Sequence, residues 1–333
     1  MHPQVCDAQQ HSCTEPAPRL RIHNVKPPLV DQRQEILSGL MAANKRVSPK
    51  YFYDEAGSRL FDQITELEEY YVTRSERTIL EREGRAICAY LSRDTMLIEP
   101  GSGSSEKVKM LLQHYLPASY APIEISEYYL ERAAQQLHVD FPELVVHAVC
   151  ADFTSLDRMP DTVPEAPKAA FFPGSTIGNF EQGAAVQLLR NLRRMLGRRG
   201  KLLIGVDLIK HPDTLHAAYN DRQGITARFN LNLLNHLGRI LNCSFDMGKF
   251  RHRAFYNQAL HRIEMHLECR EAHTLDVDGR VLVFRKGETI HTENSYKYSI
   301  EGFESLAGQA GFRRRQTWTD SERNFSFHCL EGV

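Results

Sequence analysis

A glycine-rich turn between a short apolar run and a helical segment constrains the fold of this chain more than any other feature. Residues 95–99 (TMLIE) run into the turn Pro100-Gly101-Ser102-Gly103-Ser104-Ser105, and helical spacing follows from about Glu106 to Tyr115. Glycine permits a tight turn and lets a ligand approach bare backbone. The order of strand, glycine turn and helix is typical of the first unit of a parallel α/β sheet that binds a nucleoside at its edge.

The residues of this turn restrict the ligand further. The dinucleotide fingerprint places a third glycine three positions after the second, where the helix approaches a pyrophosphate. That position is Glu106 here, an anion, which argues against a nicotinamide dehydrogenase. The turn also lacks the spacing and the Gly-Lys-Ser/Thr ending of a phosphate-binding loop. A nucleoside without phosphates fits it better, although a Gly-x-Gly turn taken alone is as often a plain loop.

Two later strands end in groups that suit the same ligand. The run from Tyr120 to Ile125 contains Glu124 near its end, about where an acid binds ribose hydroxyls. The run from Leu144 to Val149 leads to Asp152 and Phe153, which offer an acceptor for adenine and an apolar face. Each acid alone could be a helix cap or a surface residue. Three successive strand ends with suitable groups favour S-adenosylmethionine as the cofactor. Lys107 could lie near the carboxylate of that cofactor or be a solvated lysine.

Strands and helices alternate from residue 95 to residue 207, which indicates a parallel sheet with helices on both faces. The alternation stops after Asp207, and a last helix and strand follow residue 298. We therefore expect an α/β fold, a Rossmann-like sheet with a second, smaller α+β lobe. The expected division is a poorly ordered extension (1–28), a sheet domain (75–209 and 298–333) and a second lobe (29–74 and 210–297).

Charge and cysteine content exclude several classes of partner. The 41 basic and 42 acidic side chains give a net charge of −1. This balance lacks the excess of positive charge that is typical of proteins that bind nucleic acid or anionic lipid. The seven cysteines are dispersed and none forms a CxxC pair, so neither a disulfide framework nor a metal cluster is expected. No apolar run approaches membrane-spanning length. These features predict a cytoplasmic monomer whose partner is a small molecule.

The substrate is expected beyond the carboxyl end of the fourth strand, opposite the cofactor. The segment Phe172 to Phe180 (FPGSTIGNF) offers two glycines, two hydroxyls and an amide there, although Asn179 could simply cap a helix. Two aromatic stretches, residues 51–53 and 70–71, precede the sheet. Most such aromatics belong to a core, but phenol rings also attract the positive charge that develops on a methylated amine.

These segments resemble one known family. YFYDEAGSRLFDQITELEEYYVTRSE, EPGSGSSEK, CADF, GSTIGNF, AAYNDRQGITARFN, HRIEMHL and TENSYK are similar to segments of the histidine-specific Nα-methyltransferases, which make hercynine (trimethylhistidine) for ergothioneine biosynthesis. The likeness runs in order from about Leu29 to the C-terminus. The family's fold implies that the sheet domain is a class I methyltransferase domain and that the second lobe binds the substrate. Its activity implies an enzyme that methylates the α-amino group of L-histidine with S-adenosylmethionine.

The resemblance also implies roles for individual residues. Tyr53 and Asn179 are the implied catalytic residues. The implied contacts to S-adenosylmethionine are Tyr53, Gly101, Lys107, Glu124, Asp152 and Phe153. The implied histidine pocket contains Tyr70, Gly174, Asn179, Tyr219, Thr226, Met265, Glu293 and Ser295. No metal ligand is implied. By pattern alone, Met265 would be a strand core residue, and Glu293 and Ser295 would be surface residues.

This chain departs from the family at three positions, and other functions remain open. Glu124 stands where the family commonly has Asp, Pro100 replaces an aliphatic residue, and Asn294 lies between the two implied imidazole-binding residues. The nearest alternative is a relative that methylates tryptophan, a tryptophan derivative or another amino acid. Such a pocket would be expected to lack the acidic partner that Glu293 provides. A non-catalytic cofactor-binding protein is the remaining alternative.

Overall fold

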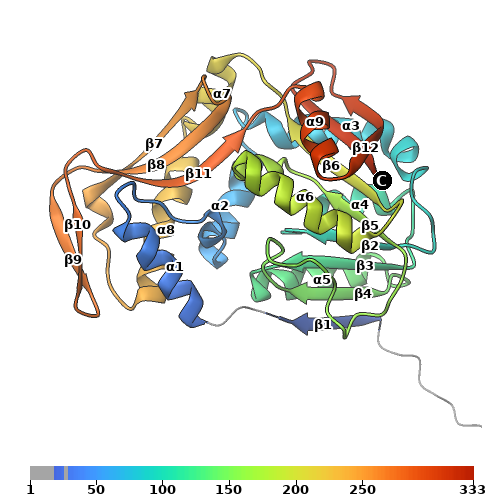
Figure 1. Ribbon diagram of the computed structural model, residues 1–333, viewed down its shortest axis with the longest axis horizontal. Helices are drawn as coiled ribbons and strands as arrows, with labels where there is room; N and C mark the ends of the chain where they lie inside the picture. Colours follow the sequence, from blue (N-terminus) through green and yellow to red (C-terminus); the bar gives the residue numbers. More distant parts are fainter. Residues whose placement is uncertain (1–18, 26–28) are drawn as a thin grey trace, which may run out of the picture.

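The structure, a computed structural model, describes residues 19–25 and 29–333. Over these residues its centre is an eight-stranded sheet (Figure 1). The strands lie in the order β1 (Leu20–Asn24), β4 (Val146–Cys150), β3 (Ser119–Glu124), β2 (Met96–Pro100), β5 (Lys168–Phe172), β6 (Lys201–Asp207), β13 (Phe325–Gly332) and β12 (Phe312–Thr319). Neighbours from β1 to β6 are parallel, whereas β13 is antiparallel to both β6 and β12.

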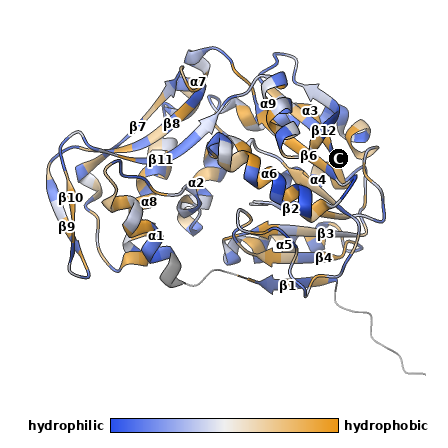
Figure 2. Cartoon of the chain, in the orientation of Figure 1, coloured by the Kyte–Doolittle hydropathy of each residue, from blue (hydrophilic) through white to orange (hydrophobic). Residues whose placement is uncertain are grey.

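Both faces of this sheet are covered by helices, which explains the continuous apolar runs of its strands. Successive side chains of a strand point to opposite faces. Thus Leu97 packs into one core, with α3 (Tyr71–Cys88), α4 (Glu106–Leu112) and α5 (Glu127–Asp140), while Met96 and Ile98 pack into the other, with α6 (Gln182–Leu196) and α9 (Ile300–Gln309). Figure 2 draws β3 and β4 largely in the hydrophobic colour.

The strand order reverses between β2 and β5. From β2 the chain proceeds through β3 to β4 on one side, and then crosses to β5 and β6 on the other. Open α/β sheets bind ligands in the crevice outside the carboxyl ends of the strands at such a reversal. The turns that follow Pro100 and Phe172 are therefore where a ligand is expected.

A smaller layered region lies beside the sheet (Figure 1). It contains an antiparallel sheet in the order β11 (Thr289–Tyr296), β8 (Arg262–Cys269), β7 (Phe250–Asn257), and the hairpin β9 (His273–Val277) with β10 (Arg280–Phe284). Its helical elements are α1 (Leu29–Met41), η1 (Pro49–Phe52), α2 (Glu55–Thr65), α7 (Pro212–Tyr219), α8 (Ile225–Leu241) and η3 (Met247–Lys249). One apolar core runs from the α3 face of the large sheet into this region.

The predicted α/β class is confirmed, and the structure differs from the sequence-based expectation in three places. Residues 20–24, expected to be poorly ordered, form β1 and pair with β4; the rest of that expected extension, 1–18 and 26–28, lies outside the described residues. The helical spacing of apolar residues predicts one helix from Asp213 to Arg239, but the structure breaks it before Gly224, whose φ is +65°. β7 and β12 were not predicted, because charged residues interrupt their alternation.

The remaining expectations concern cysteines and membrane spans. Cys88, Cys150, Cys243, Cys269 and Cys329 are free thiols, and Cys6 and Cys13 fall outside the described residues. In the described part of the chain, no helix combines the length and the apolar character needed to cross a bilayer.

Candidate active site

The turn after β2 adopts the strained backbone that its composition suggested. Gly101 and Gly103 have φ angles of +67° and +52°, and Ser105, at the start of α4, has +57°. The backbone N–H groups of Gly101 and Ser102 both donate to the carbonyl of Ile123, at 2.8 and 3.2 Å, which ties the turn to the end of β3. The hydroxyl of Ser102 is buried without a hydrogen-bond partner among the residues that the structure describes, so the turn carries a polar group that a ligand can satisfy.

Glu124 ends β3 and braces the glycine turn. One carboxylate oxygen accepts the N–H of Gly103 at 3.1 Å, and the other accepts those of Ile125 and Ser126 at 2.8 and 3.1 Å. Burial raises the pKa of Glu124 above its ordinary value, although these three N–H groups oppose that shift. The carboxylate therefore lies at the cofactor edge with fixed orientation.

Asp152 and Phe153 follow β4 at the same edge. One oxygen of Asp152 accepts from the N–H and the hydroxyl of Thr154 at 3.0 and 2.6 Å, and the other accepts from Lys50 of η1 at 3.2 Å. A Cβ on Gly101 would lie 3.3 Å from the Phe153 ring, so the ring lies against the glycine turn. Lys50 links this edge to the segment that carries Tyr53, and sequence reasoning missed it.

Glu76, a helix residue that the sequence did not single out, joins the turns after β2 and β5. Its carboxylate is fully buried and pairs with Lys107 at 2.6 Å. It also accepts the N–H of Gly174 at 2.9 and 3.0 Å. Gly174 has a φ of +81°, and a Cβ there would lie 3.1 Å from the Lys107 ammonium. Gly174 and Lys107, which were predicted as site residues, thus both contact Glu76, which was not predicted.

Asn179 ends the short helix η2 (Thr176–Asn179), which lies against β11. A Cβ on Gly178 would come within 2.8 Å of the Tyr296 carbonyl oxygen, so only glycine permits this close approach. Asn179 is partly exposed. The turn after β5 is thereby pressed against the strand that carries Glu293 and Ser295.

Three predicted tyrosines gather between the two sheets. The rings of Tyr70 and Tyr219 meet edge to face with centroids 6.3 Å apart. Phe61 connects them to Tyr53, since its ring lies 6.4 Å from Tyr70 and 5.8 Å from Tyr53. Burial, and then the nearby Glu293, raises the pKa of the Tyr53 phenol well above its ordinary value; Tyr70 and Glu124 act in the same direction. Tyr53 is therefore close to both the expected cofactor edge and the expected substrate pocket.

β11 presents Glu293 and Ser295 on one face. Glu293 lies opposite Met265 on β8, and directly opposed residues of antiparallel strands share a face. Asn294 points to the other face, where its amide donates to Glu181 at 3.1 Å. Its substitution for an aliphatic residue therefore does not alter the face that carries Glu293. Burial raises the pKa of Glu293 to about 8, against the opposing effect of Lys297.

A polar network lies behind Ser295. Its hydroxyl oxygen accepts from Tyr219 at 2.8 Å and from Lys297 at 2.5 Å. Lys297 is fully buried and pairs with Asp207, at the end of β6, at 2.7 Å. Asp207 also accepts from the Tyr71 hydroxyl at 2.7 Å and pairs with Lys210. Thr226, in the first turn of α8, donates its backbone N–H to Asp221 at 2.8 Å.

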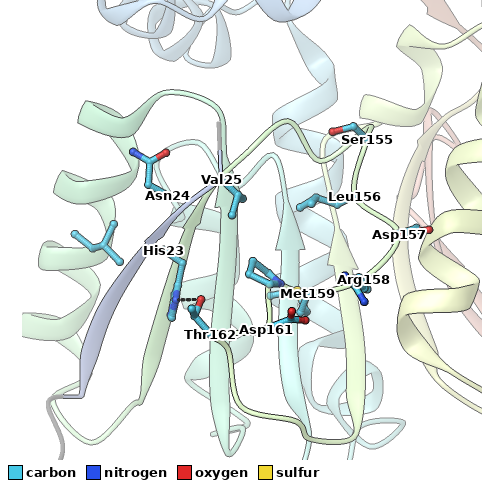
Figure 3. A pocket seen from close by; sticks show the side chains of 12 residues that line it. His23, Asn24, Val25, Ser155, Leu156, Asp157, Arg158, Met159, Asp161 and Thr162 are labelled. Carbon is cyan, nitrogen blue, oxygen red and sulfur yellow. Dashed lines mark hydrogen bonds between the residues drawn. The ribbon is translucent and has the colours of Figure 1, made fainter. Parts of the chain in front are cut away.

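Two other features lie apart from this group. A hollow of about 540 Å³ is lined by β1 and residues 155–162, where His23 and Thr162 are hydrogen-bonded at 2.8 Å (Figure 3). Glu264, His266 and His291 form a cluster with metal-binding atoms within 4.8 Å of one another. Glu264 there already accepts from Arg262 and Asn257, and His266 lies 3.1 Å from it. Neither feature includes a predicted site residue.

The structure thus brings most predicted residues to one edge. Gly101, Lys107, Glu124, Asp152, Phe153 and Gly174 surround the turns after β2 and β5, and Tyr53, Tyr70, Tyr219, Glu293 and Ser295 face them, with Met265 behind. Within the described residues, Asn179 and Thr226 have no hydrogen bond to the others, although η2 and α8 border the group. Sequence reasoning missed Ser102, Glu76, Lys50, Asp207 and Lys297. Ser102 carried a signal because it lies in the glycine turn itself, and Glu76 and Lys297 lie in segments that resemble the family.

Comparison with known proteins gives a consistent result. The family model described as histidine-specific methyltransferase, SAM-dependent, matches residues 32–332. A histidine N-alpha-methyltransferase from Mycolicibacterium smegmatis is 38% identical over 88% of this chain and 92% of its own length. An L-tryptophan methyltransferase from Psilocybe serbica is 28% identical over 90% of this chain and 91% of its own.

Among solved structures, a possible exported protein from Bordetella parapertussis aligns with a TM-score of 0.51 at 10% identity, covering 91% of this chain and 95% of that one. At this identity the similarity concerns the fold alone.

Proposed function

The chain belongs to the histidine-specific, SAM-dependent methyltransferase family, and on this premise we propose that it transfers methyl groups from S-adenosylmethionine to the α-amino nitrogen of L-histidine. The proposed product is Nα,Nα,Nα-trimethylhistidine. The observation that carries the proposal is the position of Tyr53, whose phenol interacts electrostatically with both Glu124 and Glu293. One group thus borders the expected cofactor edge and the expected imidazole partner.

The residues around the turn after β2 fit S-adenosylmethionine. Gly101 is exposed and has no side chain, the Ser102 hydroxyl has no partner in the described part of the chain, and Phe153 offers a ring beside them. The oriented carboxylate of Glu124 can accept hydrogen bonds from the ribose hydroxyl groups of the cofactor. The bound cofactor supplies a methyl group on a sulfonium, which is already activated for displacement. The protein therefore mainly needs to align the amine with that methyl and to exclude competing nucleophiles.

The substrate residues are proposed to act on three parts of histidine. Glu293 and Ser295 bind the imidazole, with Tyr70 beside it, and Met265 forms the apolar floor on the same face. Asn179 and Tyr219 bind the carboxylate and amine end, with Gly174 and Thr226 bordering the space around the amine. A pocket built from polar groups rejects apolar side chains, because those groups would be left unpaired.

The amine must be neutral to attack, and the structure limits which group takes its proton. The raised pKa of Tyr53 keeps its phenol protonated near neutral pH. Tyr53 is therefore proposed to orient the amine through its oxygen and its ring, rather than to act as a phenolate base. The positive charge that develops on nitrogen is favoured by the faces of the phenol rings. The released proton passes to solvent.

We also propose the division of the chain at the edge of the large sheet. The cofactor domain would consist of residues 75–209 and 298–333, together with the edge strand β1. The substrate lobe would consist of residues 29–74 and 210–297. The close approach of η2, in the cofactor domain, to β11, in the substrate lobe, supports a substrate site between these two parts of the chain. The near-neutral net charge supports a small amino acid as the partner, and we propose a cytoplasmic monomer.

Glu293→Ala tests the assignment. Calorimetry is expected to show no measurable histidine binding, while S-adenosylmethionine binds as to the unchanged protein. Mass spectrometry of reactions with each of the twenty amino acids is expected to show methylated histidine for the unchanged protein. Unaltered histidine affinity in the variant would refute the role of Glu293. Methylated tryptophan in place of histidine would favour the alternative, which more distant relatives such as the L-tryptophan methyltransferase support.

A further inference from the structure

The hydroxyl of Ser295 has both of its acceptor positions filled by the protein. A serine oxygen has two lone pairs and one proton. Lys297 donates to this oxygen at 2.5 Å and Tyr219 donates at 2.8 Å. In the described part of the chain no acceptor takes the proton of Ser295. The Ser295 hydroxyl can therefore form one further hydrogen bond, in which it is the donor.

Lys297 cannot reverse this arrangement, because an ammonium group has donors only. Lys297 is fully buried, and its charge is balanced by Asp207 at 2.7 Å. Burial opposes ionisation of Asp207, but Lys297 and then Lys210 hold the pKa of that carboxyl below its ordinary value. The Tyr219 hydroxyl donates to Ser295, and Lys297 also approaches the tyrosine oxygen, at 3.4 Å. The donor role left to the Ser295 hydroxyl therefore depends on Lys297, whose charge the buried Asp207 carboxylate balances.

We propose that Lys297 is a positioning residue that fixes Ser295 as a hydrogen-bond donor, so that the pocket selects the imidazole form whose unprotonated nitrogen faces Ser295. This inference rests on the proposed function, because it assumes that Ser295 meets the imidazole. The other ring nitrogen then carries the hydrogen and donates to a carboxyl oxygen of Glu293. Lys297 also opposes the rise of the Glu293 pKa that burial causes. One buried ammonium thus assigns opposite roles to the two ring partners.

A double-mutant cycle tests whether Lys297 acts through Ser295. Histidine affinity is measured by calorimetry with S-adenosylhomocysteine bound, for Lys297→Met, Ser295→Ala and the double variant. Each single change is expected to weaken histidine binding about 10-fold, the effect of losing one oriented hydrogen bond. The double variant is expected to bind no more weakly than the weaker single variant, because the two changes remove the same bond.

Lys210→Met is the matched control. Lys210 also pairs with Asp207 and has a buried ammonium, but it has no contact with Ser295. Its loss leaves the Ser295 hydroxyl with both donors, so histidine affinity is expected to stay within about twofold of the unchanged protein. In every variant, unchanged affinity for S-adenosylhomocysteine and a cooperative thermal transition establish that the fold persists. Lys297→Met keeps Asp207 paired, since Tyr71 and Lys210 still contact it.

A second measurement uses an analogue of the substrate. A pyrrole analogue of histidine keeps a ring N–H for Glu293 but has no second nitrogen to accept from Ser295. The unchanged protein is expected to bind it about 10-fold more weakly than histidine. In Lys297→Met the difference is expected to shrink, because the serine hydroxyl is no longer held as a donor.

The outcomes separate the inference from the proposed function. If Ser295→Ala leaves histidine affinity unchanged, the imidazole does not meet Ser295 and the proposed pocket fails. If Ser295→Ala weakens binding but Lys297→Met has no effect, or the two effects add, Lys297 does not act through Ser295. The same conclusion follows if Lys210→Met weakens binding as much as Lys297→Met. Equal affinity of the unchanged protein for the pyrrole analogue and for histidine would also overturn the inference.

Discussion

The Glu76 carboxylate lies 2.6 Å from the Lys107 ammonium and joins the turn after β2 to the turn after β5. Glu76 itself is on α3, so three separate segments meet at this buried ion pair. The carboxylate also fills the space above Gly205, where a Cβ would come within 2.2 Å of its oxygen. The edge at which the strand order reverses is therefore held by a side chain from a covering helix.

Glu76→Ala is expected to lower the free energy of unfolding by about 2–3 kcal/mol, because the Gly174 N–H loses its acceptor and Lys107 its buried partner. Glu76→Gln keeps an acceptor for Gly174 and is expected to lose less. Urea denaturation followed by circular dichroism measures both. Glu106→Ala removes an exposed pair with Lys109 and should change the value by less than about 0.5 kcal/mol. Equal losses for Glu76→Ala and Glu106→Ala would contradict this account.

Gly101→Ala is expected to weaken S-adenosylhomocysteine binding by at least about 10-fold while the protein stays folded. The φ angle of +67° disfavours any side chain, and the new methyl group would press on the Phe153 ring at 3.3 Å. Fluorescence or calorimetric titration measures the affinity. Gly183→Ala in α6, where a Cβ meets nothing within 4 Å, is the control. Retained affinity in Gly101→Ala would show that the ligand does not approach this turn.

Gly178→Ala is expected to affect histidine binding and S-adenosylmethionine binding differently. The added Cβ would come within 2.8 Å of the Tyr296 carbonyl oxygen and push η2 away from β11. Asn179 and Glu293 would then no longer face the same amino acid. We expect the histidine KM to rise about 10-fold with little change in S-adenosylmethionine affinity, since η2 moves and the turn after β2 does not. Gly308→Ala in α9 is the control, because its Cβ would meet open space. A matching loss of cofactor affinity would indicate general misfolding instead.

Glu293 should make the stability of the ligand-free protein depend on pH. Burial raises its pKa from an ordinary 4.5 to about 8. A carboxyl whose folded pKa lies above its unfolded pKa costs stability as pH rises between the two values, because ionisation favours the unfolded chain. Glu293→Gln cannot ionise. Its Tm relative to the unchanged protein should therefore rise between pH 5 and pH 8 and then level off.

Thermal scans from pH 5 to pH 9, without ligands, measure this difference. The same substitution at the exposed Glu322 provides the comparison. A Tm difference for Glu293→Gln that stays constant across the range would show that Glu293 does not ionise in a buried site.

The sheet could be predicted because its strands are buried on both faces, which leaves continuous apolar runs such as residues 96–98. The edge strand β12 could not, since Arg313, Arg314 and Arg315 give it no apolar alternation. The break between α7 and α8 was also hidden, because apolar residues keep helical spacing on both sides of it. Asp221 fixes that break by accepting the N–H groups of Ile225 and Thr226.

In the site, the residues on the glycine turn and strand ends were predictable because their positions follow from the order of elements. Glu76 was not, since its partner Gly174 is 98 residues away and a helical glutamate is ordinarily a surface residue. Lys297 could not be distinguished from a solvated lysine for the same reason. Contacts between residues far apart in the sequence depend on tertiary packing, which a local sequence pattern does not predict.

The strand β1 has a consequence for how copies of this protein behave toward each other. Without it, β4 would form the margin of the large sheet, and its sequence VHAVC is buried and nearly free of charge. Open margins of that kind recruit strands from other molecules and start aggregation. β1 covers the margin and replaces it with one that carries Arg21. Removal of β1 would thus leave a form prone to polymerise, even though every residue of the proposed site would be intact.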